Sequence, residues 1–199
     1  MSKFYLIANN LALDLVNTMI VDNGRPVDLL QTFADFLGWS VEAGIITKKQ
    51  ALRAKSESTK RDEVRVFDLV LKFRDTLKSM TYDLAKGKTV PQASLDRINE
   101  VLNRKNGFFE VRRTSDGYEK QFHPEFHDMA DLLVPIAESA ADLLCFGDLS
   151  QVKKCENEAC VLHFYDISKN HRRRWCSMSA CGNRAKAAAF YERKKEAGN

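Results

Sequence analysis

Apolar side chains recur every three or four positions over most of the first 146 residues, which is the spacing of helices that bury one face. The longest such segment ends before Gly87, a residue type that often follows a helix. Thr47 opens a capping box for one helix, and Asp28 is a capping residue for another. The pattern predicts helices over about residues 11–21, 28–42, 60–86, 94–103 and 124–146, and one more beginning at Thr47.

Residues 108–122 show a strand-like pattern instead. Two short runs, 108–113 and 118–122, lie on either side of the dipeptide Asp116-Gly117. Asp-Gly between two strand-forming runs is a strong signal for a tight turn. We therefore expect one β-hairpin within the helical region.

The end of the helical region is marked by Gly147-Asp148, and Pro135 is expected to kink the helix before it. The predicted fold class is mainly α with a small β-hairpin. A multihelical N-terminal domain over residues 1–148 is followed by a small domain over residues 149–199, which holds four cysteines.

The composition is that of a soluble globular protein, with 199 residues, 44% of them hydrophobic and 29% charged. The longest apolar runs are too short to cross a bilayer. Polar Asn9 and Asn10 interrupt the N-terminus before it reaches the length of a secretory signal. The expected location is the cytoplasm, with no membrane partner.

Positive charge is concentrated near the C-terminus. From residue 151 onward the chain has eleven Lys and Arg against five Asp and Glu, a net charge of +6. The first 150 residues carry 20 basic and 22 acidic side chains, a net charge of −2. A local excess of basic residues favours a polyanionic partner such as nucleic acid.

Four of the five cysteines form two pairs with the same internal spacing. The pairs are Cys155-x4-Cys160 and Cys176-x4-Cys181, with fifteen residues between them. In a reducing cytoplasm such a cluster favours metal over disulfides, and four thiolates suit one tetrahedral zinc ion. Iron–sulfur proteins use tighter, less symmetric spacings. The fifth, Cys145, lies in an apolar run and is expected to be a small core residue.

A complete shell of four thiolates leaves no position for a reactive water, so the predicted zinc is structural rather than catalytic. His163 and His171 lie between the pairs and could replace a cysteine, but with four thiols present they are expected at the surface or beside the site. His123 and His127 do not have the order of a zinc protease, and we expect a surface or capping role. No other residues form a catalytic pattern, so the protein is not expected to be an enzyme.

Basic residues surround the predicted zinc site. The loop between the pairs contains three consecutive arginines, and an Ala-rich segment that favours helix follows the last cysteine. Phe190 or Ala189 is expected to face the finger. The predicted nucleic-acid contacts are Arg172, Arg173, Arg174, Arg184 and Lys186. The alternative is a solvated charged surface with no ligand.

A second candidate site lies in the N-terminal region. Asp14, Asn17 and Thr18 are polar residues within an apolar segment. They could line a small-molecule pocket, in which Asn17 and Arg74 are the candidate ligand contacts. Alternatively, such residues bond to backbone groups at helix ends or pair within the core.

The C-terminal motifs resemble the CGNR zinc-finger family. The resemblance rests on the cysteine pairs, on Arg172-Arg173-Arg174-Trp175-Cys176 and above all on Cys181-Gly182-Asn183-Arg184. It covers about residues 150–192. It implies that the four cysteines bind zinc and that the basic finger binds DNA.

The N-terminal segment Leu13-Asp14-Leu15-Val16-Asn17-Thr18 resembles ABATE, the region that accompanies this finger in proteins proposed to be stress-induced transcription regulators. Within the finger motif, Gly182 is expected to permit a turn and Asn183 to cap a helix. Arg184 would contact phosphate or brace the zinc loops.

The function predicted from these features is that of a bacterial-type transcription regulator with one structural zinc ion. Its finger contacts DNA, and its helical domain senses a small-molecule effector or forms a homodimer. The alternative is a ligand-binding or protein-interaction module whose zinc is purely structural. RNA binding is a third interpretation of the same basic surface.

Overall fold

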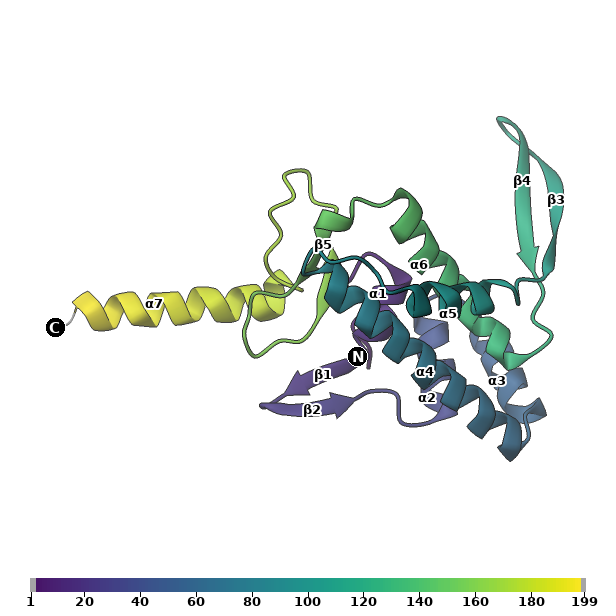
Figure 1. Ribbon diagram of the computed structural model, residues 1–199, viewed down its shortest axis with the longest axis horizontal. Coiled ribbons are helices and arrows are strands. Elements are labelled where there is room, and N and C mark those ends of the chain that lie inside the picture. Colours follow the sequence, from purple (N-terminus) through teal and green to yellow (C-terminus); the bar gives the residue numbers. More distant parts are fainter. Residues whose placement is uncertain (1–2, 198–199) are drawn as a thin grey trace.

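The computed structural model describes residues 3–197 and confirms the mainly helical fold with small antiparallel strand pairs (Figure 1). The α-helices are α1 (Leu11–Val16), α2 (Phe33–Glu42), α3 (Lys48–Glu57), α4 (Lys60–Leu84), α5 (Gln92–Leu102), α6 (Val134–Phe146) and α7 (Asn183–Ala197). The strands form three hairpins: β1 (Met19–Asp22) with β2 (Arg25–Asp28), β3 (Gly107–Thr114) with β4 (Gly117–Pro124), and β5 (Val152–Lys154) with β6 (His163–Tyr165). Short turns of other helix types are η1 (Met129–Leu133), η2 (Leu149–Gln151) and η3 (Met178–Gly182).

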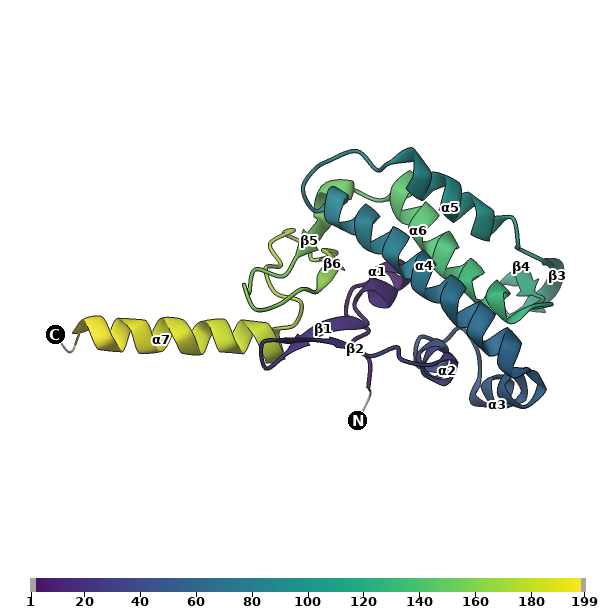
Figure 2. The ribbon, with the colours of Figure 1, turned by 60° about the horizontal axis from the view of Figure 1, so that its bottom comes forward.

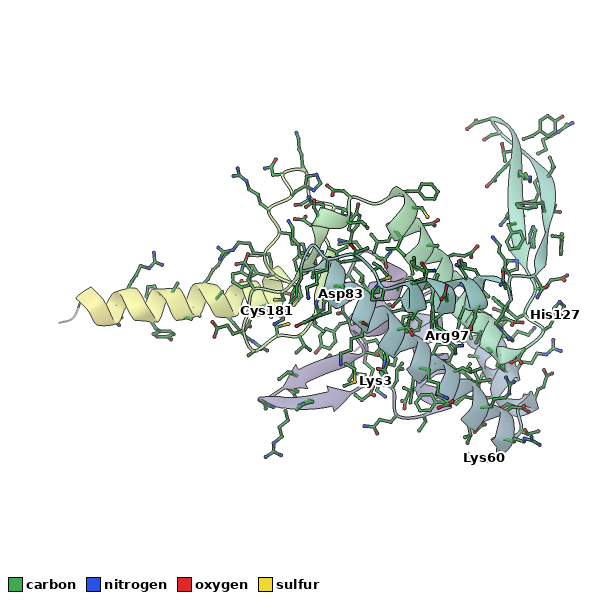
Figure 3. All side chains as sticks on the ribbon, viewed as in Figure 1. Lys3, Lys60, Asp83, Arg97, His127 and Cys181 are labelled. Carbon is green, nitrogen blue, oxygen red and sulfur yellow. The ribbon has the colours of Figure 1, made fainter. Side chains whose placement is uncertain are left out.

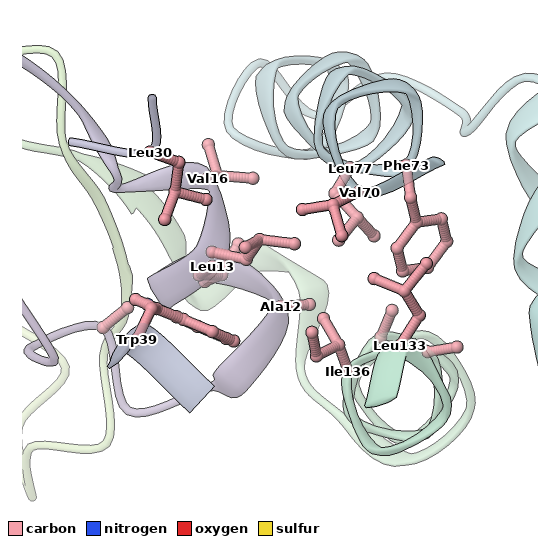
Figure 4. Packing of buried hydrophobic residues seen from close by; sticks show 14 of the residues in the cluster. Ala12, Leu13, Val16, Leu30, Trp39, Val70, Phe73, Leu77, Leu133 and Ile136 are labelled. Atoms are coloured by element: carbon pink, nitrogen blue, oxygen red, sulfur yellow. The ribbon is translucent and has the colours of Figure 1, made fainter. Parts of the chain in front are cut away.

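The central element is the short helix α1, which is almost wholly buried. Its Ala12 and Leu13 lie among side chains of the long helix α4, of η1 and of α6, including Phe73 and Ile136 (Figure 4). The apolar cluster continues into the C-terminal region through Phe164 of β6. The two predicted domains therefore share one core, and the division at residue 148 stays a prediction.

The sequence predicts correctly where α3 begins and nearly the whole extent of α4. Thr47 and Gln50 form the expected capping box of α3, and α4 covers nearly the predicted range. Gly44 and Gly87 follow α2 and α4 with positive φ angles, a conformation that glycine adopts without strain.

The predicted helix over residues 11–21 is wrong in its second half. The helix ends at Val16, and Asn23-Gly24 forms the turn of the hairpin β1–β2 with positive φ at both residues. Such a turn matches the twist of two antiparallel strands. The helix predicted from Asp28 instead starts at Phe33, because Thr32 caps it and the Asp28 carboxylate binds Arg74.

The expected helix over residues 124–146 is also shorter than predicted. Pro124 ends strand β4, and α6 begins only after η1. Pro135 lies in the first turn of α6, where its missing N–H costs nothing, so it starts this helix rather than kinking it. Cys145 is exposed rather than part of the core.

Two elements extend away from the helical body. The β3–β4 hairpin, which the sequence predicted, projects at one end, and α7 projects at the other (Figures 1 and 2). Phe190 of α7 is exposed, so the expectation that it or Ala189 faces the finger is wrong. In the part of the chain that the structure describes, no helix is both long and apolar enough to cross a bilayer.

Candidate metal centre

The structure brings the four predicted cysteines together. Cys155 follows β5, Cys160 precedes β6, and Cys181 lies in η3 where α7 joins the body (Figure 3). Cys176 is the fourth member of the cluster, and the four sulfur atoms lie within 4.8 Å of one another. Three of the cysteines are buried and Cys160 is half-buried.

The geometry of this cluster fits a zinc ion. A regular tetrahedron with Zn–S bonds of about 2.3 Å has sulfur–sulfur distances of about 3.8 Å. The Sγ atoms of Cys160 and Cys176 are 3.7 Å apart. Two N–H groups also donate to the sulfurs, from Cys176 N to Cys155 Sγ and from Asn157 Nδ2 to Cys181 Sγ, each at 3.4 Å. Such donors favour thiolates, the form that binds metal.

The two histidines between the cysteine pairs are not members of this cluster. His163 is buried in β6, and burial together with nearby Lys154 lowers its pKa to about 4. The imidazole is therefore neutral at physiological pH. His171 lies in the exposed loop with a positive φ, and its Nδ1 is 3.2 Å from the carbonyl oxygen of Asp166.

The loop between the pairs is organised by Asp166, to which the sequence argument assigned no role. Its buried carboxylate accepts hydrogen bonds from Lys153 Nζ at 2.7 Å, from both N and Oγ of Ser168 at 2.9 and 2.6 Å, and from Arg173 N at 2.8 Å. Burial alone would raise the pKa of Asp166, but these hydrogen bonds outweigh it and hold the pKa well below its usual range. The carboxylate therefore stays ionised. It ties β5 to the loop that carries Arg172, Arg173 and Arg174, which we name the arginine loop.

Arg173 has a structural role within the same loop. Its guanidinium lies 4.1 Å from the centroid of the Phe164 ring. It donates to three backbone carbonyls, those of Trp175, Cys176 and Ile7, at 3.0, 2.5 and 2.8 Å. These bonds join the metal site to the N-terminal segment and use much of the hydrogen-bonding capacity of this side chain.

The other predicted nucleic-acid contacts remain at the surface. Arg172, Arg184 and Lys186 are exposed, while Arg174 binds Glu156 at 2.6 Å and lies over the Trp175 ring. An open groove of about 610 Å³ follows the loop and is lined in part by Lys169, Arg172 and Arg174.

Comparison with protein families agrees with this arrangement. The model of the ABATE family, described as "Putative stress-induced transcription regulator", matches residues 9–147, and that of the CGNR zinc finger matches residues 151–194. The chain belongs to the ABATE family. It carries a C-terminal CGNR zinc finger, whose cofactor is one structural zinc ion. Neither family is one of enzymes, and no curated protein matches the chain.

The CGNR motif residues play partly different roles from those expected. Gly182 has no positive φ; instead, a Cβ at this position would lie 2.7 Å from Met178 Sδ and 3.2 Å from Trp175 Cδ1. Its function is close packing rather than a turn. Asn183 is already helical, and its side chain donates to the Ser179 carbonyl at 3.4 Å, so the predicted capping role is wrong.

The candidate pocket residues of the ABATE region have structural partners. The Asn17 side chain exchanges two hydrogen bonds with the backbone of His163, at 2.8 and 2.9 Å. Arg74 forms a two-point ion pair with Asp28 at 2.7 and 2.6 Å and also donates to Thr18. These bonds support the structural alternative, in which Asn17 holds β6 against α1 and Arg74 holds the β1–β2 hairpin, and the pocket stays a prediction.

Asp14, on the same helix, connects the ABATE region to the finger. Its Oδ1 accepts hydrogen bonds from the backbone N–H groups of Ile7 and Ala8, each at 2.9 Å. The carbonyls of these two residues in turn accept from Arg173 and Tyr165. Burial raises the pKa of Asp14 to about 6, although the two backbone donors and Arg173 oppose the shift.

We expect Asp14→Asn to flatten the dependence of stability on pH. The pKa of Asp14 is higher in the folded state than its ordinary value of 3.8, so wild-type stability from this group rises as the pH falls through about 6. Between pH 7 and pH 5 the gain is about 1 kcal/mol. Asparagine keeps an Oδ1 acceptor but does not titrate.

Urea unfolding of the wild type and Asp14→Asn at pH 7 and pH 5 measures this difference. The thiols titrate in both proteins, so their contribution cancels in the comparison. Asp142→Asn on the exposed side of α6 is the matched control and should follow the wild type. Parallel pH profiles for the wild type and Asp14→Asn would contradict the assignment.

Proposed function

We propose that this protein regulates transcription by binding duplex DNA through its finger, and that the thiolates of Cys155, Cys160, Cys176 and Cys181 hold the structural zinc. Residues 149–199 form the DNA-binding unit, and residues 1–148 sense an effector or pair with a second copy of the chain. No residue is assigned a catalytic role. The zinc ion holds two loops in a fixed geometry, and the side chains of those loops make the contacts.

The observation that carries the proposal is a pair of exposed, unpaired cations on a braced loop. Lys169 and Arg172 are exposed, and neither forms an ion pair within the described residues. The loop that holds them is fixed by Asp166 and Arg173. Cations held at fixed positions suit phosphate oxygens, which position a protein on DNA without reading its sequence.

Helix α7 extends this basic surface. It starts directly at the metal site and projects from the body, so its exposed side chains are accessible to a large partner (Figure 2). Its described basic residues are Arg184, Lys186, Arg193 and Lys194. An isolated helix of this length is only marginally stable in water, so contact with DNA would also stabilise it.

Duplex binding is expected to weaken in Lys169→Gln and Arg172→Gln, with little loss of stability. Each substitution removes one phosphate contact, so the slope of log affinity against log salt should fall by about 0.9 per residue. Fluorescence anisotropy with a labelled duplex over a range of salt concentrations measures both the affinity and the slope.

The control is Arg61→Gln, which removes one exposed cation from α4, far from the finger in sequence. Arg173 is left intact because its loss would disturb the loop itself. Absence of duplex binding at low salt would refute DNA regulation and favour a ligand-binding or protein-interaction module. Equal weakening by Arg61→Gln would show that the finger is not the site, whereas tighter binding to RNA would identify RNA as the partner.

A further inference from the structure

The β3–β4 hairpin has one face that combines aromatic rings with cations. Directly opposed residues of an antiparallel pair lie on the same face, and every second pair shares that face. Three such pairs make up what we name the aromatic–basic face: Phe109–Phe122, Val111–Lys120 and Arg113–Tyr118. The hairpin stands clear of the helices, and its side chains extend from both sides of the ribbon (Figures 1 and 3).

Each ring of this face has a cation near it. Lys120 Nζ lies 4.0 Å from the Phe109 ring centroid, the Arg113 guanidinium lies 5.7 Å from that of Tyr118, and Lys105 Nζ lies 4.5 Å from that of Phe122. Lys105 also pairs with Glu138. Arg113 and Lys120 have no carboxylate partner within the described residues, so they are the uncompensated charges of the face.

The carboxylates of the two strands lie on the opposite face. Glu110 binds His123 at 2.9 Å and lies 3.9 Å from Arg112, which is opposed in the ladder by Glu119. Phe108 stacks on His123 with ring centroids 5.1 Å apart. One face of the ribbon therefore carries charges of both signs, whereas the aromatic–basic face carries only positive charge.

This face is open to a partner. Phe109 is 59% exposed and Tyr118 is 74% exposed, which is unusual for large rings in a strand. A two-stranded hairpin is only marginally stable by itself in water. Its positive charge is complementary to a polyanion, and its rings can stack on planar groups.

We propose that the aromatic–basic face binds single-stranded nucleic acid, with unpaired bases stacked on its rings and phosphates held by Arg113 and Lys120. Accessible base faces distinguish this partner from a duplex, in which the bases are already stacked on one another. They also distinguish it from an acidic peptide, which offers charge without a series of planar groups. Stacking on aromatic side chains together with cations along the backbone is the general mode of single-strand binding.

The site is separate from the duplex site proposed for the finger. The hairpin and α7 lie at opposite ends of the body in both ribbon views (Figures 1 and 2). The inference rests on the register and contacts of β3 and β4, so it does not depend on the finger binding DNA.

The test is fluorescence anisotropy of a labelled oligothymidylate of about twelve nucleotides with the full chain, at about 50 and 200 mM salt. Tyr118→Leu should weaken binding by about fivefold or more, because it removes a stacking surface. Tyr118→Phe should bind like the wild type, because the ring remains. Lys120→Gln should lower the salt slope by about 0.7, the value for one phosphate contact on a single strand.

Matched variants on the opposite face are Phe108→Leu and Arg112→Gln, which should leave affinity and slope unchanged. Arg172→Gln tests the finger separately. It should weaken duplex binding, and in its presence the hairpin substitutions should still change oligothymidylate binding as they do in the wild type. Equal losses in Arg112→Gln and Lys120→Gln, or no binding at the lower salt concentration, would overturn the proposal.

Photocrosslinking gives a readout that requires no substitution in the hairpin. An oligonucleotide containing 5-iododeoxyuridine should crosslink to the wild-type chain within residues 109–122, as mapped by mass spectrometry. Crosslinks confined to residues 169–194 would place the single strand on the finger and refute the assignment. Equally efficient displacement by an unlabelled duplex would refute the preference for unpaired bases.

Discussion

Replacing Cys176 with serine is expected to release the zinc ion and to unfold the segment between β6 and α7. The described structure has no regular element between Tyr165 and Met178, so this loop depends on the metal site and on its hydrogen bonds. Zinc binding contributes roughly 10–16 kcal/mol to the folding of isolated zinc fingers, and removing one of four ligands abolishes most of it. This is the largest effect expected of any single substitution here.

Zinc per chain, measured by elemental analysis, should fall from about one to near zero in Cys176→Ser. Trp175 is half-buried beside this cysteine, so its fluorescence should shift towards that of an exposed indole. Trp39 is wholly buried in the helical core, and its contribution should change little if unfolding is confined to the finger.

Cys145→Ser is the matched control, because it removes an exposed thiol outside the cluster. It should retain one zinc ion and the wild-type spectrum. One zinc ion in Cys176→Ser, or none in metal-replete wild-type protein, would show that the four thiolates are not the zinc site.

The sequence was sufficient where the determining contacts are local. The two cysteine pairs have a spacing that a metal site allows, and the Thr47 capping box begins α3 as predicted. The Asn23-Gly24 turn was also a local signal, but the apolar residues before it suggested one helix over residues 11–21. Periodicity cannot distinguish a short buried helix followed by a strand from one longer helix.

The structural roles of Asn17 and Arg173 could not be predicted in this way. Asn17 bonds to a residue 146 positions away, and Arg173 bonds to Ile7, 166 positions away. Only the folded chain brings these groups together. A polar residue in an apolar segment and an arginine in a basic run suggest ligand contacts when their remote partners are unknown.

These remote contacts place the finger directly on the ABATE core. Asp14 holds the backbone of Ile7 and Ala8, which accept hydrogen bonds from Arg173 and Tyr165 of the finger. A change in α1 would therefore reach the arginine loop through two hydrogen-bonded steps. This connection gives the proposed sensing role a physical path to the proposed DNA surface.

Asp166→Ala is expected to have the second-largest effect, a loss of about 3–5 kcal/mol in the free energy of unfolding of the finger. The substitution removes a buried carboxylate that accepts four hydrogen bonds, and it leaves Lys153 without its ion partner. Asp166→Asn should also destabilise, because the two oxygens each accept two bonds and an amide nitrogen cannot accept any.

The effect on DNA binding separates loop order from simple electrostatics. Removing a negative charge near a phosphate site should by itself strengthen binding, and Glu158→Ala, at an exposed position in the same finger, provides that control. If Asp166 holds Lys169 and Arg172 in place, Asp166→Ala should weaken duplex binding while Glu158→Ala strengthens it slightly. Denaturant unfolding and anisotropy on the same three proteins measure both quantities. Stronger binding in both variants, with wild-type stability, would show that Asp166 acts only through its charge and does not order the loop.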